Sequence, residues 1–195
     1  MLIGITGCKG SGKDTVGQHL VDDHDFTRLA FADKLKEAAA NLFGMTIEQV
    51  EIAKNAGDSE IDGVPVWEVV VQHYNEGAFV FSWREFLQRF GTEMGRKTFG
   101  QDFWVQQWEE ELYRNSLSKD RVVATDVRFP NEAYRILHLG GVIMEISRPG
   151  HEPDGHESEE PLQRDLIDTY IDNSGTIDEL KDQVDYVIAP LLESR

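Results

Sequence analysis

Five short apolar runs recur along the chain, separated by segments whose apolar residues fall at helical spacing. The runs are too short for helices and predict strands at about 2–6, 28–31, 121–125, 142–147 and 169–171. Because strands that alternate with helices build parallel sheets, the pattern predicts an α/β fold around a parallel sheet. The predicted helices cover about 13–22, 33–43, 82–96, 102–114 and 130–139, and two more begin at Thr46 and Thr176.

Capping residues and proline set the expected ends of several helices. Thr46, Ser82 and Thr176 each precede a Glu or Gln by three residues, which is the pattern of a capping box. Pro190 is expected to kink or end the last helix, because its ring removes a helical hydrogen bond. Breaks in regular structure are expected at 55–63 and 77–81.

The length of 195 residues suits a single domain with a complete hydrophobic core. We expect the sheet-containing part of this domain to comprise residues 1–32 and 120–195. A helical region at about 33–115 is expected between the second and third strands. These helices either form a subdomain that binds a ligand or cover one face of the sheet. The acidic, glycine-containing segment 148–161 is predicted to be a mobile loop that closes as a lid.

A glycine-rich turn follows the first predicted strand directly. Residues 7–13 match the spacing G-x-x-x-x-G-K, and the strand–turn–helix context that this motif requires is met. Glycines such as Gly10 and Gly12 let successive backbone amides, including that of Ser11, face an anion. Lys13 then reaches the outer phosphates. The sequence therefore predicts a P-loop that binds nucleotide phosphates.

Three residues near the P-loop lysine decide how the metal and the phosphates are held. Asp14 stands where a Ser or Thr normally contacts Mg²⁺. Its carboxylate is either a hard ligand for the ion, directly or through water, or an exposed acid favoured by the helix dipole. We expect Thr15 to meet the α-phosphate. Lys9, inside the loop, faces the transferring phosphoryl group or is solvated, and we favour the first.

A second motif, at 122–130, is an apolar strand that ends in an acidic residue. In a Walker-B element such a strand places a carboxylate beside the magnesium of the P-loop, and Asp126 fits this role. The alternative is that Asp126 only caps the following helix. In the first case Arg128 would lie on the acceptor side, where its guanidinium can grip a phosphate in bidentate fashion.

Basic residues in the helical region are candidates for binding an anion. Lys36, Arg84 and Arg96 either converge on a phosphate or form ordinary surface ion pairs. Trp104 either stacks on a base or packs in the core. In the lid segment, Arg148 is the natural stabiliser of phosphate charge. The two lid histidines, His151 and His156, match no compact pattern of metal ligands.

The charge balance narrows the class of partner. Nineteen Lys and Arg against 36 Asp and Glu give a net charge of −17, which argues against a nucleic-acid polymer or an acidic membrane surface as a partner. A small anionic ligand is still allowed where a few cations converge. The single cysteine, Cys8, excludes an internal disulfide framework and fits a reducing cytoplasm. The apolar stretch at 2–6 is too short for a signal or a membrane span.

Taken together, the motifs resemble the bacteriophage deoxynucleoside monophosphate kinases, within the P-loop nucleoside monophosphate kinases. The similarity covers nearly the whole chain in the right order. In that family an Asp follows the P-loop lysine, so Asp14 becomes a mark of the family. The matching runs are 7–15, 29–36, 87–93, 103–105, 126–132, 140–143 and 156–159.

The resemblance implies a three-layer P-loop kinase fold with a central parallel five-stranded sheet, a helical acceptor-binding insertion and a lid loop. It also implies ATP as donor, a dNMP as acceptor, Mg²⁺ as cofactor, and work in the host cytoplasm if the protein is phage-encoded; a homodimer is compatible with it. The implied catalytic residues are Lys9, Lys13, Arg128 and Arg148. The implied ATP-binding residues are Gly10, Ser11, Gly12, Lys13, Asp14, Thr15, Asn173 and Gly175, with Asp14 and Asp126 at the metal. The implied acceptor-binding residues are Lys9, Asp33, Lys36, Arg84, Gln88, Gly91, Thr92, Arg96, Trp104, Arg128 and Glu132.

Two alternatives remain open on sequence alone. A dephospho-coenzyme A kinase shares the P-loop and an Asn-x-Gly turn before its last helix, but it would need a general base, for which Asp33 is the candidate. A non-catalytic nucleotide sensor is the second alternative. The runs 87–93 and 126–132 favour the dNMP kinase, whose acceptor phosphate is ionised near neutral pH and needs no base.

Overall fold

The chain is organised as two units in the computed structural model, which describes residues 1–55, 60–61, 64–65, 68–73, 77–115, 120–150 and 160–193. We call Met1–Phe31 together with Val105–Arg195 the core unit, and Ala32–Trp104 the insertion unit. Each unit is described by itself. Between 56 and 81 only the backbone of the short strands is described.

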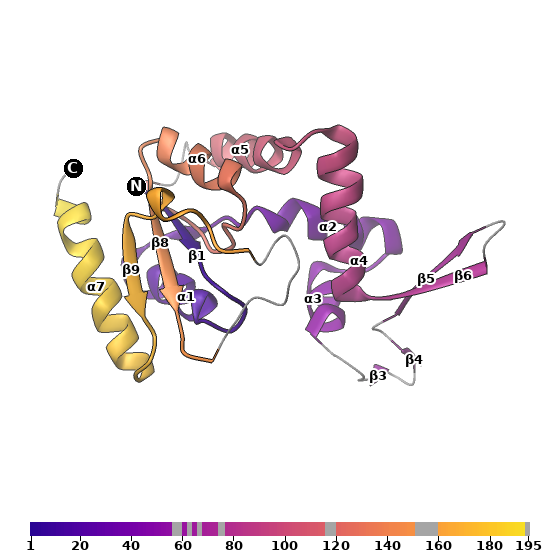
Figure 1. The fold of residues 1–195 in the computed structure, drawn as a ribbon, viewed down its shortest axis with the longest axis horizontal. Helices are drawn as coiled ribbons and strands as arrows, with labels where there is room; N and C mark the ends of the chain where they lie inside the picture. Colours follow the sequence, from indigo (N-terminus) through magenta and orange to yellow (C-terminus); the bar gives the residue numbers. More distant parts are fainter. Residues whose placement is uncertain are drawn as a thin grey trace. The chain divides into compact units, whose positions relative to one another are not determined.

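A five-stranded sheet in the order β2-β7-β1-β8-β9 forms the centre of the core unit (Figure 1). Every strand pair in it is parallel, as the alternation of strands and helices predicts. Ile3 of the central strand lies in register with Val123 on one side and Val142 on the other. The strands are β1 (Leu2–Thr6), β2 (Thr27–Arg28), β7 (Val122–Ala124), β8 (Val142–Ser147) and β9 (Thr169–Asp172).

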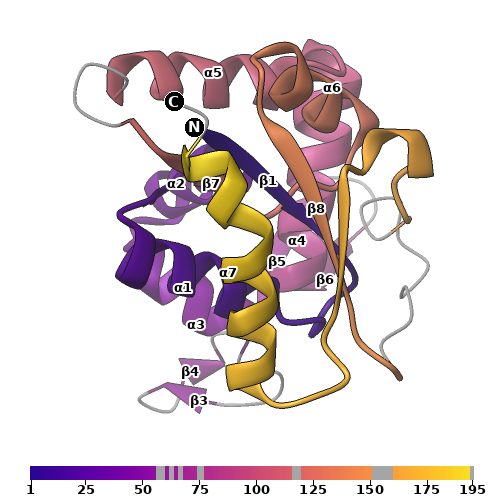
Figure 2. The same ribbon diagram turned by 90° about the vertical axis from the view of Figure 1, so that its left-hand side faces the viewer.

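Helices cover both faces of this sheet, which makes three layers (Figure 2). Alternate residues of a strand point to opposite faces, so Leu2 packs with one apolar cluster and Ile3 with the other. Residues of α5 and α6 complete the first cluster, and residues of α1 and α7 complete the second. The helices are α1 (Lys13–His24), α5 (Phe103–Asn115), α6 (Pro130–His138) and α7 (Ile177–Glu193), with a short 3₁₀ helix at Arg164–Leu166.

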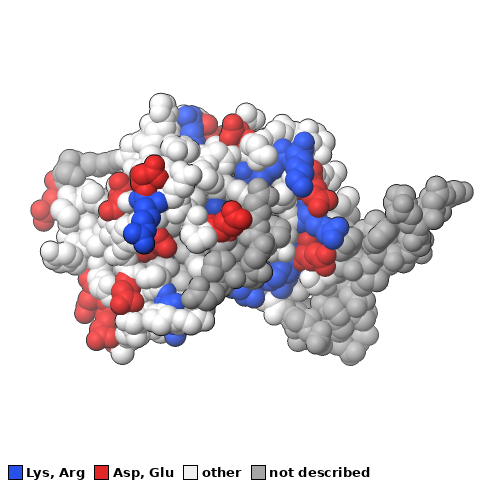
Figure 3. Space-filling view, in the orientation of Figure 1, with Lys and Arg blue, Asp and Glu red and all other residues white. Residues whose placement is uncertain are grey.

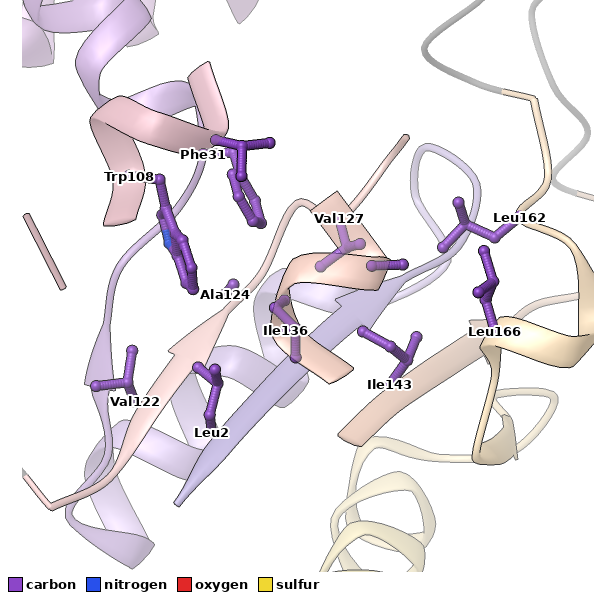
Figure 4. Packing of buried hydrophobic residues seen from close by; sticks show 12 residues of the cluster. Leu2, Phe31, Trp108, Val122, Ala124, Val127, Ile136, Ile143, Leu162 and Leu166 are labelled. Atoms are coloured by element: carbon purple, nitrogen blue, oxygen red, sulfur yellow. The ribbon is translucent and has the colours of Figure 1, made fainter. Parts of the chain in front are cut away.

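Trp108 anchors α5 to the sheet (Figure 4). Its ring stacks on Phe31 with the centroids 4.5 Å apart, and its indole N–H donates a hydrogen bond of 2.9 Å to the carbonyl oxygen of Leu29. Trp108 is 1% exposed. Because Leu29 and Phe31 follow edge strand β2, this one side chain joins the edge of the sheet to the covering helix.

We predict that Trp108→Ala lowers the free energy of unfolding by about 3–5 kcal/mol, the usual cost of truncating a buried aromatic side chain to alanine. Chemical denaturation followed by circular dichroism measures it. Tyr186→Ala is the matched control, because Tyr186 is 84% exposed on α7 and should change stability little. Equal losses in the two variants would contradict the assigned packing.

The insertion unit contains helices and two β-hairpins. The hairpin of β5 with β6 corrects the expected break at 77–81 and adds strands to a region expected to be helical. Its segments carry Val-rich and Phe-containing runs that favour strands, a signal outweighed in the prediction by the flanking glycine. The elements are α2 (Ala32–Phe43), α3 (Ile47–Asn55), β3 (Glu60–Ile61), β4 (Val64–Pro65), β5 (Glu68–His73), β6 (Gly77–Ser82), α4 (Trp83–Arg89) and the π-helix η1 (Phe90–Thr98).

The capping boxes at Thr46 and Thr176 are confirmed in both contacts, and at Ser82 the contact from the Glu85 N–H to the hydroxyl is confirmed. The hydroxyls of Thr46, Ser82 and Thr176 each accept the backbone N–H of the residue three positions on. One predicted helix differs from expectation. The helix expected over 82–96 is instead α4 followed by the π-helix. Pro190 does not end α7; it lies exposed inside the helix, where water can take the hydrogen bond that its ring removes.

On the face drawn in Figure 3, the described acidic and basic side chains are interspersed. Among the described residues, no helix is long and apolar enough to cross a membrane.

Candidate active site

The turn between β1 and α1 is built around three glycines with positive φ. These are Gly7 (139°), Gly10 (78°) and Gly12 (109°), a conformation that side chains rarely adopt. Space is limited as well: a Cβ on Gly7 would lie 2.2 Å from the carbonyl oxygen of Ile146, and one on Gly12 would lie 2.5 Å from Nδ2 of Asn173. The predicted spacing of glycines is therefore a steric requirement of this turn.

Helix α1 begins at the turn without a capping side chain, because its N-cap residue is Gly12. The first amides of a helix and its dipole attract an anion at this end. A second glycine, Gly17, lets α1 approach the sheet, since a Cβ there would lie 2.3 Å from Cγ2 of Thr125. Close packing against the strand edge thus sets where the helix N-terminus lies.

Lys13 folds back over the turn. Its Nζ donates hydrogen bonds to the carbonyl oxygens of Gly7 (2.7 Å) and Cys8 (2.6 Å). Inside the same turn, Ser11 is 1% exposed, and its Oγ has no hydrogen-bond partner within the described part of the chain. A buried hydroxyl without a partner is costly, and a phosphate oxygen would satisfy it. The turn therefore fits an anionic ligand chemically as well as sterically.

Asn173, at the end of β9, braces the turn from the other side. Its Nδ2 donates a buried hydrogen bond of 2.7 Å to the carbonyl oxygen of Ser11. Its backbone N–H donates another of 2.7 Å to the carbonyl oxygen of Ser147. Gly175 follows in the same loop, where the carboxylate of Glu179 would lie 2.3 Å from an added Cβ. Sequence reasoning expected these two residues to edge the adenine; the structure places the Asn173 amide against the P-loop backbone.

We predict that Asn173→Ala raises the KM for ATP about tenfold, because it leaves the Ser11 carbonyl buried without a donor at a cost of about 1–3 kcal/mol. Steady-state kinetics with varied ATP measures this. Ser174→Ala is the control, since Ser174 is exposed and its hydroxyl donates a hydrogen bond to the carboxylate of Asp172, which is exposed as well. An unchanged ATP KM in Asn173→Ala would show that the brace does not hold the loop for its ligand.

Asp126 lies just beyond the carboxyl end of β7, the strand beside β1. Its Oδ1 accepts the backbone N–H of Phe31 at 2.8 Å, so the carboxylate also fixes the chain after β2. Asp14 is exposed in the first turn of α1, and Thr15 is partly buried beside it. Carboxylate oxygens are the donors that a hard cation such as Mg²⁺ prefers, so these two acids fit that ion by donor type.

Glu132 holds the turn that carries Arg128. The Oε2 of Glu132 accepts the backbone N–H groups of Arg128 (2.8 Å) and Phe129 (3.1 Å), and the residue is 3% exposed. It therefore fixes the backbone at the start of α6 and the place from which the Arg128 side chain leaves. Lys9 and Arg148 are exposed, at the P-loop and just after β8.

In the insertion unit, two lysines pair with one carboxylate, and the charge of Arg84 acts on one of these lysines. Lys36 and Lys54 both pair with Glu51, the second at 2.6 Å. Burial alone would raise the pKa of Glu51, but the hydrogen bonds and charges of the two lysines outweigh it and hold that pKa below its usual range. Burial, with the positive charges of Lys36 and Arg84, lowers the pKa of Lys54. Lys54 was missed from sequence because its isolated position gives no motif.

Other predicted acceptor residues of this unit take part in its packing. Arg96 is 5% exposed and donates from Nη1 to the carbonyl oxygen of Gln101 at 2.9 Å. Trp104 is 7% exposed and donates from Nε1 to the carbonyl oxygen of Gly91 at 2.8 Å, seated where Gly95 leaves room. Three more candidates, Asp33, Gln88 and Thr92, are partly buried.

Part of the predicted lid lies outside the described residues, including 151–159 with both of its histidines. The core unit brings together the P-loop, Asp126 and Asn173 at the carboxyl edge of the sheet. The insertion unit brings together Lys36, Arg84 and Lys54.

A glycine loop between the central strand and a helix, on a parallel sheet of this order, defines a P-loop protein that binds nucleotide phosphates. The family profile of the deoxynucleotide monophosphate kinases matches residues 40–184. The chain belongs to this family. It is a phosphotransferase that acts on nucleotides, and membership of a kinase family implies ATP as the donor. The family match confirms the resemblance seen in the sequence and sets aside the dephospho-coenzyme A kinase and the nucleotide sensor as alternatives.

Named relatives agree with this assignment. A protein of Acanthamoeba polyphaga mimivirus, provisionally described as a deoxynucleotide monophosphate kinase, is 33% identical over 94% of each chain. The deoxynucleoside-5′-monophosphate kinase of Escherichia phage T5 is 28% identical over 68% of this chain and 70% of its own. Among solved structures, the dephospho-CoA kinase of Campylobacter jejuni covers 97% of this chain and 96% of its own at 15% identity, with a TM-score of 0.48, too low to carry an argument about activity.

Proposed function

We propose that the protein transfers the γ-phosphoryl group of ATP to the phosphate of a dNMP and so serves deoxynucleotide supply. The observation that carries the proposal is the P-loop of this protein, in which Lys13 folds across the turn and the buried Ser11 hydroxyl lies inside it. Membership of the deoxynucleotide monophosphate kinase family supports the same function. An oxygen of the dNMP phosphate attacks the γ-phosphorus, the bond to the β-phosphate oxygen breaks, and dNDP and ADP result.

On the donor side, the backbone of residues 10–12 and the start of α1 hold the ATP phosphates. Lys13 exchanges contacts with the loop carbonyls for contacts with phosphate oxygens, which its three donors permit. Lys9 and Arg148, both exposed, neutralise charge on the transferring group, and Thr15 meets the α-phosphate. Phosphoryl transfer depends on alignment and charge neutralisation, so no enzyme nucleophile is required.

We propose Asp14 and Asp126 as the residues that hold Mg²⁺, whose part is to offset phosphate charge and to orient the phosphates when it is bound. Asp126 has a second task that does not depend on the ion. Its contact with the Phe31 N–H joins the segment that follows β2 to the segment that follows β7, so Asp126 also supports the edge of the site.

On the acceptor side, Lys36 and Arg84 are proposed to bind the dNMP phosphate, with Lys54 adding charge. Lys36 and Lys54 share one carboxylate, Glu51, and the charge of Arg84 acts on Lys54, so the group keeps a positive excess that suits a dianion. Arg96 and Trp104 are proposed to act by holding the π-helix, which carries Gly91 and Thr92. These two residues, with Gln88 near the end of α4, are proposed to meet the nucleotide. Asp33, Arg128 and Glu132 complete the proposed acceptor residues.

We predict that Lys13→Ala lowers kcat at least about 10³-fold, the scale expected when a main charge stabiliser of phosphoryl transfer is lost. The variant should keep its fold, which circular dichroism checks. Lys181→Ala is the control, because Lys181 lies on α7 with its side chain 40% exposed and has no part in the proposed phosphate site. Normal turnover in Lys13→Ala would reject the mechanism.

Arg128→Ala is expected to raise the KM for the dNMP by about 10–100-fold, through the loss of a bidentate phosphate contact, with a smaller effect on the KM for ATP. Kinetics with each substrate varied in turn separate the two constants. Arg114→Ala serves as the control, since the Arg114 side chain is 66% exposed at the end of α5. An unchanged dNMP KM would remove Arg128 from the acceptor site.

A further inference from the structure

A group of two histidines and two aspartates joins the end of α1 to α7, within the core unit. The Oδ1 of Asp185 lies 2.6 Å from Nε2 of His19 and 2.7 Å from Nε2 of His24. The other ring nitrogen of His19, Nδ1, lies 2.7 Å from Oδ2 of Asp23. No step of the proposed phosphoryl transfer uses these residues.

Each contact of Asp185 needs a hydrogen atom or a metal ion between the two atoms that it joins. A carboxylate oxygen and an unprotonated imidazole nitrogen both present lone pairs, so at 2.6–2.7 Å they repel unless a proton or a metal ion lies between them. Two contacts to one oxygen require two protons, or a single divalent cation that both nitrogens and the carboxylate share. Because Nδ1 of His19 also faces a carboxylate, that of Asp23, a neutral ring with one N–H can satisfy only one of its two contacts, whereas a metal ion at Nε2 allows both.

Asp23 orients His19 for binding a divalent cation. A histidine that ligates a metal usually donates its other ring N–H to a carboxylate, which fixes the tautomer and aims the free nitrogen. The Asp23–His19 contact has this arrangement and leaves Nε2 directed at Asp185. The ligand atoms of His19, His24 and Asp185 all lie within 4.8 Å of one another.

The backbone holds His24 in place for this role. Asp25 ends α1 in the left-handed conformation, with its N–H bonded to the carbonyl of Leu20. Nη1 of Arg121 donates a hydrogen bond of 2.8 Å to the carbonyl oxygen of His24. The second histidine is thus held by a helix cap and by a neighbouring strand segment.

We propose that His19, His24 and Asp185 form a binding site for a zinc-type divalent cation, with Asp23 positioning His19. Two imidazoles and one carboxylate suit Zn²⁺ and its neighbours, whereas Mg²⁺ prefers oxygen ligands alone. Bonds of about 2.0 Å in tetrahedral geometry separate ligand atoms by about 3.3 Å, so the contacts of 2.6 and 2.7 Å each open by roughly 0.6–0.7 Å. Asp185 can make this adjustment because its side chain is 46% exposed, and water can take the fourth position.

The bound ion ties the end of α1 to α7, while the other end of α1 carries the P-loop. Its effect is therefore on the stability of the folded core unit rather than on the chemical step.

The test is calorimetric titration of chelator-treated, full-length protein with Zn²⁺ at pH 7.5, together with thermal unfolding with and without the ion. We expect one ion per chain at this site and a rise in Tm on binding. Co²⁺ in place of Zn²⁺ should give the visible absorption of a cation with nitrogen ligands.

His24→Gln and Asp185→Asn should each remove the site, and Asp23→Asn should weaken binding about 10–100-fold. His138→Gln, which alters an exposed histidine on α6, and the double variant His151→Gln/His156→Gln should bind as the natural protein does. Circular dichroism in zinc-free buffer confirms that each variant folds.

The proposal is overturned if Zn²⁺ does not bind saturably, or if binding and the Tm shift survive in both His24→Gln and Asp185→Asn. It is also overturned if only the His151→Gln/His156→Gln protein loses the ion. None of these outcomes depends on a kinase assay, so the metal-site proposal can fail while the proposed function holds, and the reverse.

Discussion

The hydrogen bond from Asn173 to the carbonyl of Ser11 is the contact around which the site is organised. It fastens the loop after β9 to the turn after β1, two segments that β8 separates in the sheet. Gly12 must lack a side chain for this contact to form, because a Cβ there would strike the Asn173 amide. The P-loop is therefore braced by the sheet edge as well as by its own glycines.

Sequence predicted the parts of the fold that depend on local rules. Strand length, helical spacing and the P-loop glycines led to the parallel sheet and the phosphate-binding turn, because each is dictated by neighbouring residues. Contacts between distant segments could not be derived in this way. The Lys36–Glu51 pair joins α2 to α3, and the Asp185 contacts to His19 and His24 join α7 to α1; no motif relates the faces of these helices. The hairpin of β5 and β6 was missed because glycine and polar residues at its ends outweighed strong strand formers.

The same charge rule operates in both units. A chain with a net charge of −17 repels polyanions in general, so anionic nucleotides must be met by cations gathered locally. In the insertion unit, Glu51 holds Lys36 and Lys54 close together. In the core unit, carbonyl oxygens of the P-loop hold Lys13. Each cation thus has a native partner, which keeps it positioned without a substrate.

The central claim is tested most directly by ADP release from ATP, measured in a coupled assay with each dNMP in turn and with dephospho-coenzyme A. We expect release to require a dNMP and to produce the matching dNDP, with dephospho-coenzyme A giving no more than the background rate. Release that no dNMP stimulates, or that dephospho-coenzyme A supports as well as a dNMP does, would contradict the assignment.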